Sequence, residues 1–229
     1  MSFVCGEQGC TSQCTRWSQI NEGEPVRYYH DKSLWDPTWY PQLTEVDPQV
    51  YLDRAIAIWE TDLPTGYLFT EVADPAQADL IISYPGQAQN PEGVIADATC
   101  FCDADDDVCV RQVDHSFFYG TDPGEAQARI NMYLMPNRDY PEDLWINVYV
   151  HELGHILGMG HVYGLPVLSV MGDGINPANN GGLRLYDFDR AERDRRYPFG
   201  CDLNQGPFQT LLSLEPNNTR TFCPGCQGL

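Results

Sequence analysis

Three of the five histidines in this chain lie within eleven residues, in the run His151-Glu-Leu-Gly-His-Ile-Leu-Gly-Met-Gly-His161. His151 and His155 are four residues apart, so on a helix both imidazoles project from one face, one turn apart. Two nitrogens placed in this way can bind a single Zn²⁺, while Glu152 beside them stays free to act as a base.

Gly158 gives the chain the freedom that a third ligand needs. Glycine adopts positive φ at little steric cost, so the helix can end there and the chain can turn back. The turn would bring His161 to the metal and leave a fourth coordination position for water. The pattern therefore predicts a catalytic site with one Zn²⁺. The alternative for each histidine is an ordinary solvated or core side chain.

A methionine follows this run in Ser169-Val-Met-Gly172. The pattern His-Glu-x-x-His-x-x-Gly-x-x-His, followed by such a methionine, resembles the metzincin zinc metallopeptidases. The resemblance implies an endopeptidase in which Glu152 is the general base. It also implies that Met171 forms a tight apolar turn beneath the zinc without binding it. Tyr163 and Tyr186 are candidate donors to the oxyanion, with packing as the alternative role of both.

The elements that must position this motif alternate between strand and helix patterns. Five strands are predicted, at 26–30, 67–71, 78–84, 94–99 and 129–135. Three helices are predicted, over about 48–60, from Pro141 through the zinc motif, and over 185–197. Asp47-Pro48 is a strong start for the first helix, because Asp caps a helix and proline suits its first position.

This order of elements is similar to that of the matrixin branch of the metzincins, over roughly residues 26–197. The resemblance implies an α+β fold, with a twisted, mostly parallel five-stranded sheet that has one antiparallel edge strand and packs on long helices. It also implies that substrate lies extended along the edge strand. By order of elements that strand comprises Val94, Ile95, Ala96, Asp97, Ala98 and Thr99.

The chain departs from known branches in three respects. Val162 stands where matrixins usually have Ser or Thr after the third histidine. Only His30 and His115 remain outside the motif, which is too few for the second, structural zinc of matrix metalloproteinases. Asp173 stands where astacins have a tyrosine. These departures leave the branch within the metzincins open.

Nine clustered cysteines favour an oxidising compartment, and their odd number leaves at least one free, paired between chains or bound to metal. We expect a cysteine-rich extension over 1–25, a catalytic domain over 26–200 and a cysteine-containing tail over 201–229. The first residues lack the pattern of a signal peptide. We therefore expect a secreted or extracytoplasmic protein whose export signal has been removed.

The net charge of −20 argues against nucleic acid or an anionic membrane as a partner. No apolar run reaches the length of a membrane span. We expect a monomer whose partner is a protein or peptide substrate. Part of the acidity lies in a cysteine-flanked loop in which Asp103, Asp105 and Asp107 are candidate ligands for Ca²⁺. The alternative is that they form a solvated loop face.

Two other classes of function remain open. The first is a zinc-binding relative that does not cleave, against which the intact Glu152 argues. The second is a zinc hydrolase that acts on a non-peptide amide or ester.

Overall fold

The computed structural model describes residues 17–39, 43–85, 95–99, 128–133, 141–162, 168–172, 183–197 and 199. Within these ranges five strands form one sheet in the order β2-β1-β3-β5-β4. The strands are β1 Val26–Asp31, β2 Phe69–Glu71, β3 Leu80–Ser83, β4 Ala96–Thr99 and β5 Ala128–Met132. All neighbouring pairs are parallel except β4 and β5, which are antiparallel. The predicted sheet, mostly parallel with one antiparallel strand, is confirmed.

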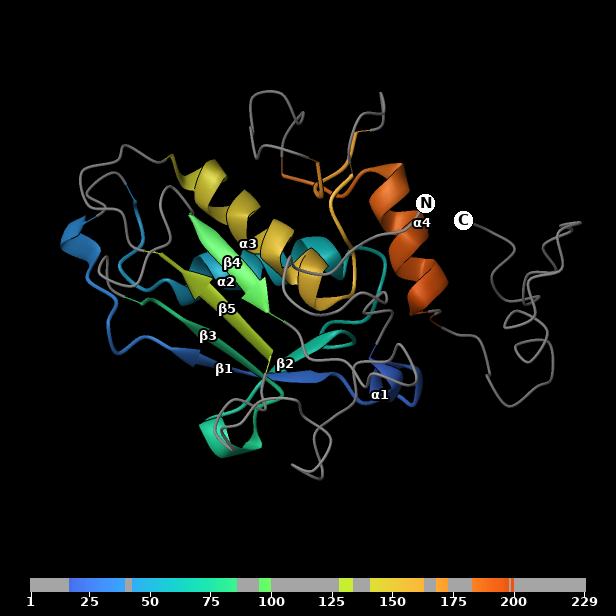
Figure 1. Ribbon diagram of the computed structural model, residues 1–229, viewed down its shortest axis with the longest axis horizontal. Coiled ribbons are helices and arrows are strands. Elements are labelled where there is room, and N and C mark those ends of the chain that lie inside the picture. Colours follow the sequence, from blue (N-terminus) through green and yellow to red (C-terminus); the bar gives the residue numbers. More distant parts are fainter. Residues whose placement is uncertain are drawn as a thin grey trace, which may run out of the picture.

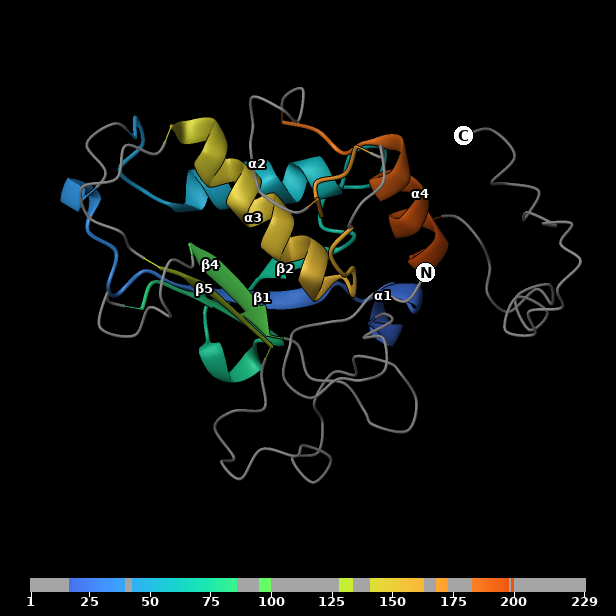
Figure 2. The ribbon, with the colours of Figure 1, turned by 45° about the horizontal axis from the view of Figure 1, so that its top comes forward.

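The helices are α1 Ser18–Asn21, α2 Gln49–Trp59, α3 Glu142–Ile156 and α4 Asp187–Arg196, with short 3-10 turns at Pro37–Trp39 and Pro75–Gln77. Figures 1 and 2 show α2 and α3 side by side on one face of the sheet, with α4 beyond the C-terminal end of α3. Helix α1 lies within the cysteine-rich extension that was expected over 1–25. None of these helices, within the part of the chain just described, is long and apolar enough to cross a membrane.

Alternation within the strands explains which face of the sheet carries the helices. In β1 the side chains of Val26, Tyr28 and His30 are buried, while those between them are only partly so. Strand β3 begins with three buried aliphatic residues, as the apolar run at 78–84 predicted for a central strand. The buried face packs against α2 and α3, which places the metal-motif helix directly on the sheet.

Helix α2, which lies beside α3, is held at both ends by bonds to side chains. At its start, Asp47 Oδ1 accepts from the backbone N–H of Gln49 at 3.0 Å. Pro48 occupies the cap position, so the helix begins one residue later than predicted. At the C-terminal end of α2, the buried guanidinium of Arg193 donates to the carbonyls of Trp59 and Thr61, both at 2.7 Å. Because Arg193 belongs to α4, these bonds hold α4 against the end of α2.

Residues before the expected domain start contribute to the core. The indole N–H of Trp17 donates to the carbonyl of Ile156, at the end of α3, at 2.7 Å. The hydroxyl of Tyr197 donates to the next carbonyl, that of Leu157, at 3.1 Å. These carbonyls have no partner within the helix, so both bonds satisfy the end of α3. Trp17 and Ile20 are buried in the same core as the sheet, while all nine cysteines lie outside the described residues.

Candidate metal centre

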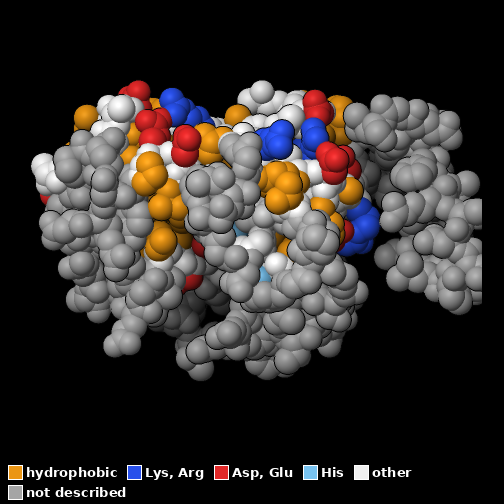
Figure 3. Space-filling model, turned by 90° about the horizontal axis from the view of Figure 1, so that it is seen from above, with side chains coloured by type: hydrophobic (Ala, Val, Ile, Leu, Met, Phe, Trp, Pro, Cys, Tyr) orange, Lys and Arg blue, Asp and Glu red, His pale blue; other side chains and the backbone are white. Residues whose placement is uncertain are grey.

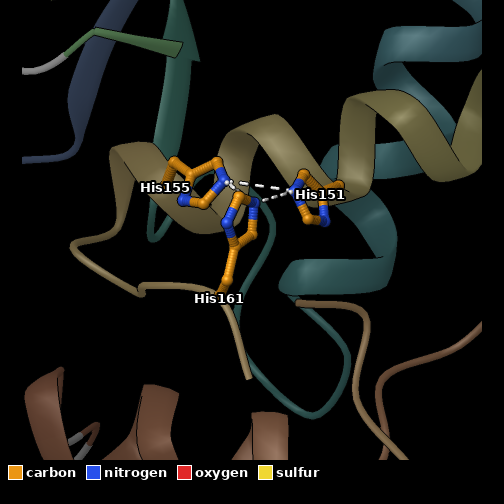
Figure 4. Close-up of side chains that lie close together, drawn as sticks. All are labelled: His151, His155 and His161. Carbon is orange, nitrogen blue, oxygen red and sulfur yellow. Dashed lines mark hydrogen bonds between the residues drawn. The ribbon is translucent and has the colours of Figure 1, made fainter. Parts of the chain in front are cut away.

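Helix α3 carries the first two histidines of the motif on a segment that is almost wholly buried. Its residues from Trp145 to Gly154 are buried, including His151 and Glu152, and His155 is half-buried. The helix ends just after Ile156, and Gly158 adopts the predicted positive φ of 83°. The chain then returns, so that His161 approaches α3 from the other side (Figure 4).

The three imidazoles converge on one point. The Nε2 atoms of His151, His155 and His161 lie 3.1 Å from one another in all three pairs. Of the histidines, cysteines and acidic residues in the described ranges, these three alone form a group that could hold a metal ion. His161 is exposed, and Figure 3 shows histidine surface in the middle of the face seen from above, with hydrophobic side chains on either side. The cluster is therefore open to solvent.

Backbone carbonyls fix the tautomers of two of the rings. The Nδ1 atom of His151 lies 2.8 Å from the carbonyl oxygen of Val170. The Nδ1 atom of His155 lies 2.8 Å from the carbonyl oxygen of Met159. A carbonyl oxygen can only accept, so each Nδ1 must carry the proton and donate it. In the neutral rings, both Nε2 atoms therefore present lone pairs to each other.

Two facing lone pairs repel unless a proton or a cation lies between them. Burial lowers the pKa of His151 to about 4, and burial followed by the neighbouring His151 lowers the pKa of His155 to about 3. Both rings are therefore neutral at neutral pH, and no proton joins their Nε2 atoms. A cation bound to all three nitrogens removes the repulsion and fits this arrangement.

The separation of the nitrogens suits zinc. Tetrahedral zinc with Zn–N bonds of about 2.0–2.1 Å holds its nitrogen ligands about 3.3 Å apart. The observed 3.1 Å is close to this value. Histidines whose other nitrogen donates to a carbonyl are also the usual form of zinc-binding imidazole. The donor set and its geometry thus fit a zinc ion with a coordination position open to water.

Met171 lies against α3 at Gly154, which stands between His151 and His155 in the sequence. A Cβ atom added to Gly154 would lie 2.3 Å from the Met171 sulfur and 2.9 Å from a ring carbon of Trp59. Met171 is 1% exposed, and its carbonyl accepts from the N–H of Val162 at 2.8 Å. The methionine turn therefore contacts both α3 and the residue that follows His161.

A buried carboxylate connects that turn to α4. Asp189 is fully buried and accepts from the Ser169 hydroxyl at 2.5 Å and from the Val170 N–H at 3.0 Å. It also accepts from the N–H of Tyr186, at the start of α4, at 3.0 Å. Val170 is the residue whose carbonyl holds His151. Asp189 therefore supports, through the turn, the carbonyl that accepts from His151, and burial raises the pKa of its carboxyl.

Glu152 has the burial expected of a base in a protected site. It is 5% exposed, and burial, with the negative charge of Asp97 as a second cause, raises its pKa to about 8. Asp97 belongs to β4, and α3 packs beside that strand. A cation at the histidine cluster would oppose both effects, because a nearby positive charge favours the carboxylate.

Strand β4 is the last strand in the sheet order, beside α3. The N–H of Tyr133 donates to the carbonyl of Ile95 at 2.9 Å, so these residues form a hydrogen-bonded pair. Such pairs alternate along an antiparallel ladder. Asp97 and Thr99 therefore direct their N–H groups toward β5, whereas Ala96 and Ala98 direct theirs away from β5, where the described residues place no further strand. The strand begins at Ala96, and Val94 lies outside the described residues.

The other candidate residues are placed only in part. Asp103, Asp105, Asp107 and Tyr163 lie outside the described residues. The hydroxyl of Tyr186 is buried, and the side chain of Arg184 lies beside it. Tyr186 packs in the core, and the guanidinium carbon of Arg184 lies 5.5 Å from the centroid of the Tyr186 ring.

Gly154, Ser169 and Asp189 were not singled out from the sequence. Asp189 did carry a local signal, because an acidic residue three positions after the start of a helix often accepts from the cap N–H. Nothing local indicated that the same carboxylate reaches Ser169 and Val170, twenty and nineteen residues earlier.

Comparison of the chain with models of known protein families gives no match, and neither does comparison with curated proteins.

Proposed function

We propose that the protein is a zinc-dependent endopeptidase with a metzincin-type catalytic domain. The observation that carries the proposal is the triangle of Nε2 atoms 3.1 Å apart, two of which belong to rings whose protons are held by carbonyls. His151, His155 and His161 would hold the zinc. The buried Glu152 follows His151 directly in the sequence and is the base.

The roles of the residues follow from their positions. A bound zinc would supply a Lewis acid that polarises a carbonyl and lowers the pKa of its water to about 7. Glu152 would accept a proton from the attacking water and return it to the leaving amine. Burial raises the pKa of this carboxylate to about 8, and a cation at the histidines would lower it again toward neutrality, which suits a group that must both take and give a proton. Met171 and Gly154 keep the turn beneath the ligands in place.

The substrate backbone would pair with the free edge of β4. The outward N–H and C=O groups of Ala96 and Ala98 are available for an added strand, which is how edge strands commonly bind extended peptides. This arrangement would place a peptide beside α3 and Glu152. The proposal includes secretion with disulfide bonds among the nine cysteines, and a calcium site at Asp103, Asp105 and Asp107.

The experiment that tests the function combines metal analysis with casein digestion. Purified protein should contain one zinc per chain and should digest casein. Glu152→Ala should keep the zinc and the fold but lose activity by several orders of magnitude, because it removes the base alone. Asp143→Ala is the matched control, since Asp143 is an exposed acid on the same helix, and it should retain activity.

Each other outcome identifies a different function. Protein with one zinc that cleaves neither casein nor small amides and esters would be a zinc-binding relative. Cleavage of small esters or amides without casein digestion would indicate a non-peptide hydrolase. A metal-replete Glu152→Ala protein with near-normal peptidase activity would contradict the assigned mechanism.

A further inference from the structure

A chain of hydrogen-bonded side chains crosses the domain from α2 to the metal-bearing helix, and each member after the half-buried Gln49 is buried. Gln49 Oε1 of α2 lies 2.6 Å from Nδ1 of His30 in β1. The other ring nitrogen of His30 lies 2.5 Å from the hydroxyl of Tyr84, just after β3. The Tyr84 hydroxyl also bonds the hydroxyl of Tyr149 in α3. His30 and Tyr84 thus connect α2 and β1 with α3. His30 is 4% exposed.

The direction of every bond follows from Gln49. Its Nε2 donates to the hydroxyl of Tyr28 at 3.1 Å and to Asp53 at 2.8 Å, so its Oε1 is the atom facing His30. His30 Nδ1 must therefore carry a proton and donate it. In the neutral ring Nε2 can then only accept, so the Tyr84 hydroxyl donates to it. The oxygen of Tyr84 in turn accepts from the Tyr149 hydroxyl.

The last member of this chain lies two residues before the first metal ligand. Tyr149 is fully buried, on the side of α3 that faces the sheet. Aromatic rings pack around it, since Trp145 lies edge-on to Tyr149 with ring centroids 6.2 Å apart, and Trp35 contacts both Trp145 and Tyr84. The bond from Tyr149 is therefore one of the contacts that set the position of α3 on the sheet.

We propose that His30 and Tyr84 are positioning residues that hold the metal-bearing helix on the sheet at neutral pH and release it in acid. Protonated His30 has an N–H at both ring nitrogens. Tyr84 can then no longer donate to Nε2, so the directions of the bonds from His30 through Tyr84 to Tyr149 must change. The protonated ring would also place a positive charge in a site that is only 4% exposed, so acid favours the arrangement in which His30 is opened to water.

The surroundings of His30 oppose its protonation. Burial is the main cause that lowers its pKa, from 6.5 to about 4, and the nearby charge of Lys32 lowers it further. The hydrogen bond with Gln49 acts in the opposite direction, as do the charges of Asp47, before α2, and Asp53, within α2. Tyr84 and Tyr149 supply only hydroxyls from β3 and α3. Because the folded pKa lies below the unfolded value, the stabilisation by neutral His30 is complete above pH 6.5 and is lost as the pH falls toward 4.

Amide hydrogen exchange on the full-length, zinc-loaded protein tests this inference. The rates in α3, corrected for the intrinsic effect of pH, report the population in which the helix is open. If opening exposes His30, the two pKa values predict about a 30-fold larger open population at pH 5 than at pH 7.5. The ligand histidines add their own acid dependence, so the decisive quantity is the difference between the natural protein and its variants.

Two variants distinguish the protonation of His30 from the hydrogen bond that connects Tyr84 to α3. His30→Gln keeps an acceptor near Tyr84 but cannot be protonated, so most of the extra opening of α3 in acid should disappear. Tyr149→Phe leaves His30 and Tyr84 bonded, so amides of β1 should keep their acid dependence while those of α3 lose it. This second variant preserves the test if His30→Gln does not fold.

The contrary results are equally specific. If α3 opens in acid to the same extent in all three proteins, the acid dependence belongs to other groups and the inference is wrong. It is also wrong if α3 in the natural protein opens no more at pH 5 than at pH 7.5. The readout requires no peptidase activity, so failure of the proposed function would leave this result interpretable.

Discussion

Gly154 is the residue whose small size the metal centre depends on most directly. It lies one position before His155, where the Met171 side chain and the Trp59 ring both press against the helix. The Trp59 indole is held there by its N–H bond to the carbonyl of Val150 at 2.8 Å. Any side chain at position 154 must displace the end of the methionine or the fixed indole.

Gly154→Ala should therefore destabilise the protein by about 1–3 kcal/mol, the usual range for overpacking a core. It should also weaken zinc binding, because the displaced turn carries the carbonyl that holds His151. Urea unfolding and competition with a chromophoric chelator measure the two effects. Met171→Ala in the same chain should restore part of the stability, since it removes the closest contact. If Gly154→Ala costs the same stability with Met171 as with Met171→Ala, crowding against Met171 is not the cause of the loss.

At the scale of elements, α4 holds the turn at Val170, and the carbonyl of Val170 accepts from His151. The carboxylate of Asp189 accepts three bonds, two of them from the turn at Ser169 and Val170. Burial raises its pKa, yet these donors favour the charged form. The carboxylate thus joins two elements through bonds that only an acceptor can make.

Asp189→Asn should lower zinc affinity by about 10–100-fold, the usual effect of disturbing groups behind a metal ligand. The amide nitrogen cannot accept, so at least one of the three donors loses its partner. Chelator competition measures the affinity. Asp187→Asn is the matched control, because Asp187 lies on the same helix with its side chain fully exposed, and it should change little. Equal affinity in the two variants would separate α4 from the metal centre.

Strand β4 yields a second prediction at this scale. Ala98 directs its N–H away from β5, so Ala98→Pro should spare the ladder but remove a bond to substrate. We expect a lower kcat/KM for peptides with zinc content and Tm nearly unchanged. Ala98→Val controls for added bulk and should keep activity. Asp97→Pro should mainly lower Tm, because its N–H faces β5, with Asp97→Ala as the control for its side-chain bonds to Asn131 and Tyr133. The opposite ranking would show that substrate is held elsewhere.

At the scale of the whole molecule, the metal centre joins parts that the sheet does not. His151 and His155 come from α3, His161 from the returning chain, and Met171 from a turn that α4 holds through Asp189. Without a cation, the facing lone pairs of His151 and His155 repel each other. An ion that binds the folded chain alone therefore stabilises the entire arrangement.

Removal of zinc with 1,10-phenanthroline should lower Tm by about 10 °C, which follows from roughly 4 kcal/mol of binding at a thousandfold excess over Kd. Differential scanning calorimetry measures the shift. His161→Ala, which removes an exposed ligand, should already melt at the lower temperature and respond little to the chelator. EGTA separates any contribution of calcium. A full shift in His161→Ala would place the stabilising metal at another site.

The sequence by itself determined the features that depend on local geometry. The spacing of His151 and His155 and the positive φ of Gly158 are properties of one helix and its end, so neighbouring residues suffice to predict them. Strand and helix periodicity likewise predicted the five strands of the sheet and the helices α2, α3 and α4, with differences of a few residues at their ends.

Only the tertiary structure decided how these parts act on one another. The proton of His151 is fixed by Val170, nineteen residues away, and the arginine that closes α2 lies 134 residues from Trp59. His30 is an ordinary strand residue until α2, β3 and α3 pack around it. A single buried polar bond has no periodic pattern in the sequence, because its partners are chosen by how the packed elements cross and not by the residues beside them.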